Sequence, residues 1–180
     1  ISAVLGASMV AYYTVPFEVL IRVLVVPAAL TSALFPRLAT LMTTDMANAR
    51  HLYGRCLKIV TLTLLPICLV LALGSKWGMT FWLGKDFAEH SWMIVCVMAL
   101  GLLFNGIAYI PFAMIQAAGD ARSTAHLHIF EFIIYLPLLL FALKTYGLIG
   151  AAIAWTLRVV VDFFILLILG RTKISDTNNE

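Results

Sequence analysis

The chain has 180 residues, of which 63% are hydrophobic and 12% are charged, and its mean hydropathy is +1.02. Soluble proteins are about 45–50% apolar and about 25% charged, so these values exclude an ordinary water-soluble enzyme. The formal charge of +3 does not indicate nucleic acid as a partner, because membrane proteins concentrate basic residues in their cytoplasmic loops. The composition predicts an all-α polytopic membrane protein in contact with membrane lipids.

The first predicted span, residues 7–37, contains three prolines at positions 16, 27 and 36. Proline removes a helical hydrogen bond and kinks a helix, so we expect one long, broken span. Residues 38–58 bring in several charged and polar side chains. We therefore expect them to form a loop that leads into the second span.

Four further spans follow, since about 20 apolar residues cross a bilayer as a helix. They cover residues 59–75, 92–114, 126–143 and 148–169. Residues 76–90 combine tryptophans with charged side chains, which is typical of a connection at the membrane surface. Residues 1–170 then form one transmembrane lobe of about five helices, and residues 171–180 form a polar, disordered tail.

Basic residues predict the orientation of the five spans. Seven fall on one side and three on the other: Arg37, Arg50, Arg55, Lys58, Arg122, Arg171 and Lys173 against Lys76, Lys85 and Lys144. Cytoplasmic loops are enriched in Lys and Arg. We expect the C-terminus to be cytoplasmic and residues 76–90 to be outside.

Five charged side chains lie within the predicted spans, where each costs roughly 2.5–3.5 kcal/mol at mid-bilayer. They are Glu18, Arg22, Glu131, Arg158 and Asp162. The i,i+4 spacing of two acid–base pairs, positions 18 with 22 and 158 with 162, predicts ion pairs on single helix faces. Two interpretations remain: neutralised pairs that hold helices together, or a polar translocation path in which the arginines meet an anionic substrate.

Glu131 has no base at i,i+4, but His128 precedes it by one turn and Tyr135 follows by one turn. This face would relay a proton or simply satisfy one buried carboxylate. Asn105 and Gln116 belong to a partly polar stripe on the third span, and such amides either bond neighbouring helices or line a cavity.

Motifs of phosphate-binding loops, zinc proteases and serine hydrolases are absent from the sequence, so we predict no catalytic residue, no cofactor and no metal site. A coupling ion, H⁺ or Na⁺, stays open.

Five short segments are similar to members of one transporter family. They are residues 12–16 (YYTVP), 34–37 (LFPR), 82–88 (WLGKDFA), 116–120 (QAAGD) and 146–158 (YGLIGAAIAWTLR). In this order and spacing they resemble the oligosaccharide flippase family, the O-antigen and polysaccharide-unit transporters of the multidrug/oligosaccharidyl-lipid/polysaccharide exporter superfamily.

The resemblance implies a bacterial inner-membrane protein of two six-helix lobes that moves undecaprenyl-diphosphate-linked oligosaccharides by alternating access. It implies that this chain is most of the second lobe, a C-terminal fragment whose partner is a missing N-terminal lobe. Arg22 and Arg158 would attract the lipid diphosphate, while Glu18, Glu131 and Asp162 would balance charge or take part in ion coupling.

Two alternative functions remain open. A multidrug exporter of the same superfamily would favour acids over bases in its cavity. A membrane-embedded polysaccharide polymerase would act on the same lipid-linked substrate, but it is expected to carry a larger outer loop than residues 76–90.

Overall fold

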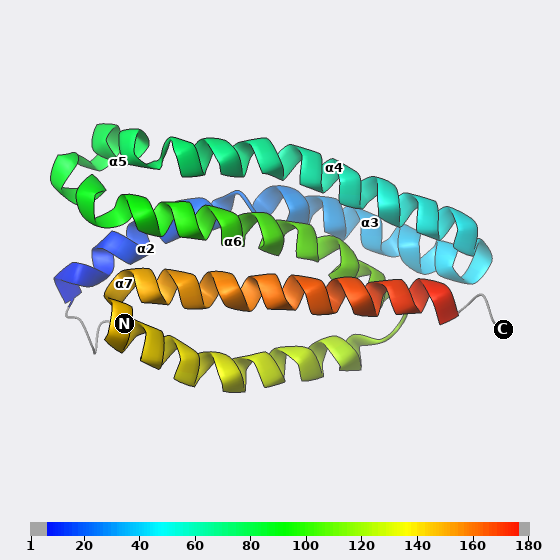
Figure 1. Cartoon of the computed structure of the whole chain (residues 1–180). Coiled ribbons are helices and arrows are strands. Elements are labelled where there is room, and N and C mark those ends of the chain that lie inside the picture. The colour runs from blue at the N-terminus through cyan, green and yellow to red at the C-terminus, as the bar shows by residue number, and fades with distance from the viewer. Residues whose placement is uncertain (1–6, 177–180) are drawn as a thin grey trace.

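The computed structural model describes residues 7–176, and side chains from residue 9 to residue 174. Within this range the secondary structure is entirely helical (Figure 1). The helices are α2 (Ala7–Arg22), α3 (Val25–Thr44), α4 (Met46–Leu73), α5 (Ser75–Leu83), α6 (Lys85–Ala117) and α7 (Ala121–Asp176). The predicted all-α class is confirmed.

Four stretches of helix are long and apolar enough to cross a membrane: Met9–Thr44, Met46–Leu73, Lys85–Ala117 and Ala121–Ile174. The last of them folds back on itself at Gly147, whose φ of 62° and ψ of −143° belong to a region essentially restricted to glycine. Residues 121–146 and 148–176, which we call the first and second arms of α7, therefore run antiparallel (Figure 1). The chain is thus a multi-pass membrane protein whose helices make five passes.

The break in the first span occurs between α2 and α3, a few residues before Pro27. Proline cannot donate the backbone hydrogen bond that a continuous helix would direct to the carbonyl of Val23, so the helix is interrupted there. Pro16 and Pro36 instead lie inside helices that continue through them. Only one of the three expected kinks therefore divides the span.

Residues 38–58 are helical, so the predicted loop is wrong. Helix α3 continues to Thr44, and α4 begins at Met46 after the single residue Asp45. The Asp45 side chain accepts a hydrogen bond from the backbone N–H of Asn48, 3.1 Å away, and caps α4. Polar residues that extend a helix beyond the apolar region resemble a loop in composition, and this resemblance misled the prediction.

The connection at residues 76–90 is also largely helical. Helix α5 covers most of it, Gly84 (φ 89°) forms the turn, and α6 begins at Lys85. The side chains of Trp77 and Trp82 are exposed, as the prediction of a membrane-surface position requires. At the other end of the chain, α7 extends into the predicted tail as far as Asp176, and residues 177–180 lie outside the described residues.

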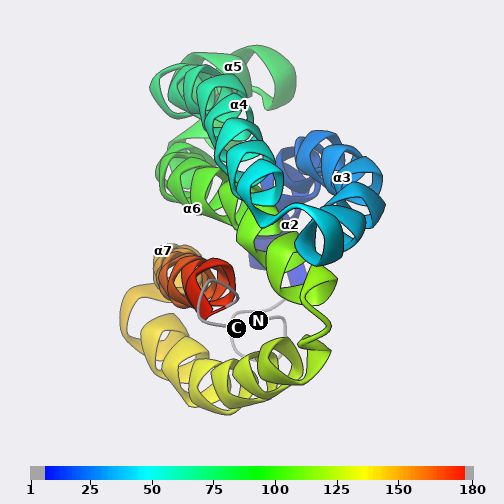
Figure 2. The same ribbon diagram turned by 90° about the vertical axis from the view of Figure 1, so that its right-hand side faces the viewer.

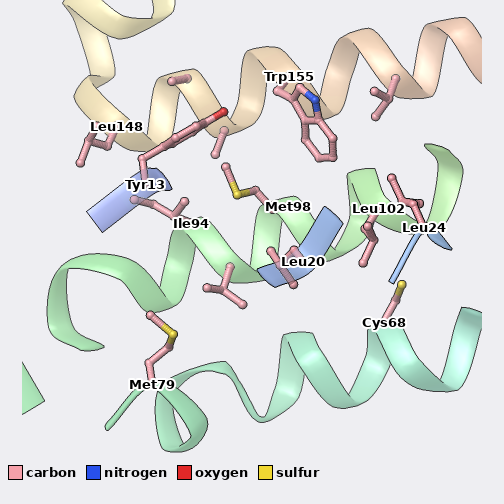
Figure 3. Close-up of a cluster of buried hydrophobic side chains, with 14 of the residues drawn as sticks. Tyr13, Leu20, Leu24, Cys68, Met79, Ile94, Met98, Leu102, Leu148 and Trp155 are labelled. Carbon is pink, nitrogen blue, oxygen red and sulfur yellow. The ribbon is translucent and has the colours of Figure 1, made fainter. Parts of the chain in front are cut away.

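Helix α6 lies at the centre of the bundle and packs against each of the other helices (Figure 2). Around its first half, Met98 and Leu102 are fully buried, with Leu20 of α2 and Trp155 of the second arm against them (Figure 3). Trp155 lies against Gly101, where any β-carbon would collide with its ring. Small residues at helix contacts allow the close packing that stabilises membrane bundles, where lipid removes the hydrophobic driving force between helices.

The arrangement separates the chain's basic residues into the two groups that the sequence suggested. The α3–α4 turn, the α6–α7 turn and the end of α7 lie at one end of the bundle (Figure 1). Helix α5 and the fold-back at Gly147 lie at the opposite end, with Lys76, Lys85 and Lys144 in those segments. Five passes therefore place the beginning and the end of the described chain on opposite faces.

Replacing Gly150 with Ala is expected to destabilise the protein. A β-carbon at this position would collide with the carbonyl of Ala142, which is backbone of the opposite arm and cannot rotate away. Overpacking of this kind costs about 1–3 kcal/mol. The matched control is Gly54→Ala in α4, where a β-carbon meets nothing within 4 Å. Thermal unfolding of the purified proteins measures both, and equal melting temperatures would contradict the close contact between the arms.

Candidate functional site: a buried charge cluster between α6 and the arms of α7

The buried charged side chains of the bundle meet between the two arms of α7. Arg158 and Asp162 come from the second arm, with Asp162 midway between Leu148 and Asp176, and Glu131 comes from the first arm. Glu131 is 7% exposed and Asp162 is 9% exposed. The Nη2 atom of Arg158 lies 3.4 Å from Oε2 of Glu131, which joins the arms by an ion pair.

Arg158 pairs with Glu131 and not with Asp162, so the predicted i,i+4 pair on the second arm is wrong. Side chains of a helix lean toward its N-terminus, and a base followed by an acid at i,i+4 is the less favourable order. For Arg158 this direction leads toward Gly147, and its guanidinium carbon lies 5.3 Å from the ring centre of Tyr135 on the antiparallel first arm. The arginine therefore bridges to the other arm, stacked on an aromatic face.

His128 of the first arm completes the cluster. Its Nδ1 atom lies 3.5 Å from Oε2 of Glu131 and 3.8 Å from Oδ1 of Asp162. One ligand atom from each of these three residues lies within 4.8 Å of the others. Arg158 already places a positive charge against Glu131, and it would repel a metal ion at this point. The arrangement is therefore better suited to sharing a proton than to holding a metal.

Two cavities border the cluster. One of about 180 Å³ is partly polar and is lined by Asn105, Ala108, Tyr109, Phe112, His128, Asp162 and Leu166. The other, of about 200 Å³, lies between the arms and is lined by Phe130, Glu131, Ile134, Tyr135, Leu138, Leu157, Arg158, Val161 and Ile165. Apart from the ion pair and the tyrosine, the side chains of this second cavity are apolar. A charged group thus lies beside an apolar groove.

Several polar atoms of the cluster are buried without a hydrogen-bond partner. They are Oε1 of Glu131, Oδ1 of Asp162 and Nε of Arg158. Buried polar atoms are normally satisfied, because an unmet hydrogen bond costs about 1–3 kcal/mol. The cluster therefore retains capacity for further hydrogen bonds, unlike a closed structural network.

The structure brings together four of the seven residues predicted for the site: Asn105, Glu131, Arg158 and Asp162. Gln116 lies farther along α6, where its amide donates to the hydroxyl of Thr124 over 2.8 Å and so bonds neighbouring helices. Glu18 and Arg22 are exposed on α2.

Glu18 and Arg22 form no ion pair within 4.0 Å in the described structure, so this predicted pair is not formed. Their spacing is favourable, but an exposed pair gains little energy and loses side-chain entropy. Their role toward a substrate stays a prediction.

The set of predicted site residues omitted His128, Tyr135 and Tyr109. The spacing of His128 and Tyr135 around Glu131 was the available signal, one turn on either side of the carboxylate. Tyr109 stands one turn after Asn105 on the polar stripe of α6. Helical spacing in the sequence shows which residues share a face of one helix. It does not show which other helix packs against that face.

A second group of polar contacts, far from Gly147, ties the second arm to the α6–α7 turn and the start of the first arm. Lys173 lies 2.8 Å from Asp120, and the hydroxyl of Ser123 donates to the same carboxylate. These hydrogen bonds lower the pKa of Asp120 to about 2, so its carboxylate is ionised and able to pair with Lys173 at neutral pH. Arg50 of α4 donates to the carbonyl of Ile174 over 3.2 Å. Both arms and α4 are therefore joined at this end.

The fold and the site define the class of protein: a multi-pass, all-helical membrane protein with a charge cluster, partly buried, between the two arms of its last helix. No protein-family model matches the chain, and no solved structure matches it significantly. The chain is 37% identical, over 166 residues, to a curated protein of Shigella flexneri named "Putative O-antigen transporter". The match covers 92% of this chain and 39% of that relative, and it supports an O-antigen transporter-like family.

Removing Arg158 is expected to destabilise the protein through Glu131. Arg158→Ala leaves a buried carboxylate without its partner, which costs about 3–5 kcal/mol when a buried pair is broken. Adding Glu131→Gln should recover most of this loss, because the neutral amide needs no counter-charge. Arg55→Ala, which removes an exposed arginine of α4, is the control. A double variant no more stable than Arg158→Ala alone would contradict the pairing.

Proposed function

We propose that the chain is part of a flippase that translocates undecaprenyl-diphosphate-linked oligosaccharide units across the bacterial inner membrane, for polysaccharide or O-antigen biosynthesis. The observation that carries the proposal is the similarity to the O-antigen transporter-like protein over 92% of this chain. Such a protein acts by translocation and not by catalysis. Its partners are the lipid-linked substrate and the surrounding membrane lipids.

The geometry of the cluster supports an amphiphilic anion as substrate. Arg158 offers a guanidinium whose Nε has no partner, and this group suits the paired oxygens of a phosphate. The apolar cavity beside it would receive the first units of a lipid chain. A diphosphate between a lipid and a sugar combines the charge and the apolar chain that these two features require.

Alternating access requires a second wall for the translocation path. The chain spans 39% of the length of its curated relative, and we propose that a further lobe supplies that wall. Three residues of this chain would contact either the substrate or that further lobe: Glu18, Arg22 and Gln116. With the seven basic residues in the cytoplasm, the end of α7 lies inside the cell.

A multidrug exporter is the second candidate. The observation that favours it is the charge of the cluster, which contains two carboxylates and one arginine. An amphipathic cation would bind such an excess of acid. It would gain nothing from Arg158, so the arginine distinguishes the two functions.

Replacement of Arg158 by Lys is expected to reduce glycan export at least tenfold while membrane abundance stays near that of the native protein. Lysine keeps the charge opposite Glu131 but lacks the planar, bidentate donor geometry that a phosphate uses. The assay is restoration of surface glycan by the full-length protein in a strain that lacks its own flippase. Immunoblotting of membranes gives the abundance.

Two companion variants separate substrate binding from structure. Arg158→Ala should lose both abundance and export. The charge swap of Arg158→Glu with Glu131→Arg should recover abundance but not full export, because the guanidinium then projects from the first arm. Export that follows abundance in all three variants would make Arg158 a structural partner only.

The orientation has its own test. A cysteine introduced at Lys85, in the end of the bundle near α5, should react with a membrane-impermeant maleimide in intact spheroplasts. One introduced at Arg122, at the opposite end, should react only after the cells are opened. Cys56 and Cys68 are buried and Cys96 is half-buried, so a variant with all three replaced by serine is the background. The reverse labelling pattern would contradict the cytoplasmic C-terminus.

A further inference from the structure

The charge cluster between the arms contains more acidic than basic side chains. Glu131 and Asp162 supply two carboxylates, Arg158 supplies one guanidinium, and His128 is charged only when it holds a proton. Guanidinium stays protonated at any physiological pH. With both acids ionised and the imidazole neutral, the cluster has a net charge of −1, and both of its carboxylates, those of Glu131 and Asp162, are buried.

A negative charge on buried carboxylates without a counter-charge costs free energy, and one bound proton neutralises it. The atoms that would share the proton already converge, because Nδ1 of His128 stands 3.5 Å from Glu131 and 3.8 Å from Asp162. Oδ1 of Asp162 has no hydrogen-bond partner, and the partnerless Oε1 of Glu131 adds a further acceptor.

The groups that face the cluster from each packed element do not supply this charge. They are Asn105, Tyr109 and Phe112 of α6, Tyr135 of the first arm and Leu166 of the second arm. The amide and the apolar side chains carry no charge, and phenols are neutral near pH 7. The net charge of the site is therefore set by the four residues of the cluster alone.

The same geometry links the proton to an anion. A single contact of 3.4 Å joins Arg158 to Glu131, so a phosphate that binds the guanidinium competes with that carboxylate. Displaced from the arginine, the buried carboxylate of Glu131 loses its counter-charge, and a bound proton would replace the charge that the guanidinium supplied. By thermodynamic reciprocity, the proton must then strengthen binding of the phosphate by the same factor.

We infer that His128, Glu131 and Asp162 form a proton-binding site that is linked with positive sign to phosphate binding at Arg158. The inference rests on the proposed function for the contact between Arg158 and phosphate. It adds that a proton is the second ligand, it names the residues that bind this proton, and it gives the sign of the coupling between proton and phosphate. Substrate anion and proton occupy the cluster together and do not exchange for one another.

Calorimetry on the full-length protein in lipid nanodiscs tests the linkage. The probe is farnesyl-diphospho-N-acetylglucosamine, a diester whose phosphates do not titrate near neutral pH. Titrations in two buffers of different ionisation heat give the number of protons taken up on binding. We expect an uptake that approaches one proton, and an affinity that falls up to about tenfold for each unit of rising pH.

Glu131→Gln removes the displaced carboxylate and leaves Asp162 balanced by Arg158. This variant should bind the probe at least as tightly as the native protein, with little proton uptake and a flat pH profile. His128→Gln is the second variant, at a partly exposed side chain, and it should also lower the uptake. Glu89→Gln, which neutralises an exposed carboxylate at the start of α6, is the matched control and should keep the native profile.

Different results overturn different statements. Probe binding without proton uptake and independent of pH would overturn the linkage while leaving substrate binding at Arg158 intact. Affinity that rises with Na⁺ at constant pH would show a metal cation in place of the proton and would also overturn it. Undiminished binding by Arg158→Gln would instead overturn the phosphate contact, and with it the proposed function of this site.

Discussion

Close packing against α6 is the interaction on which the rest of the bundle depends. Gly101 and Gly106 leave room on this helix for Trp155 of the second arm and Leu64 of α4, which fill the positions that a β-carbon would occupy. Lipid chains are as apolar as leucine, so helices in a membrane associate through such contacts and not through exclusion of water. Asn105 lies between these two glycine positions, and α6 is thereby held close to the second arm on one side and to α4 on another.

The charge cluster exists because the fold provides a place where its members satisfy one another. The first arm carries an acid and an imidazole, and the second carries a base and an acid. Separated, each of these groups would face lipid at a cost of several kcal/mol. Brought together by the fold-back at Gly147, they leave three polar atoms unpaired. These unpaired atoms leave the cluster able to form further hydrogen bonds, which a fully satisfied set of ion pairs could not do.

The sequence predicted the class and the passes well because apolar length alone decides whether a helix crosses a membrane. It failed at residues 38–58, where helices extend beyond the apolar region and polar composition no longer separates helix from loop. It also failed for Arg158, since helical spacing describes neighbours on one helix and the partner, Glu131, lies on another. The predicted boundary between the spans at residues 126–143 and 148–169 agrees with the fold-back at Gly147, although composition alone does not reveal the positive φ on which the turn depends.

The contact between Lys173 and Asp120 gives α7 the form of a closed clip. Its arms are joined covalently through Gly147 at one end and by this ion pair at the other, with Arg50 of α4 fastened to the same end. Neither end of the clip can spread without breaking a buried or charged contact. A long molecule therefore cannot thread between the arms along their axis. Under the proposed function, a lipid would therefore reach the cavity beside Arg158 from the side of the clip and not along its axis.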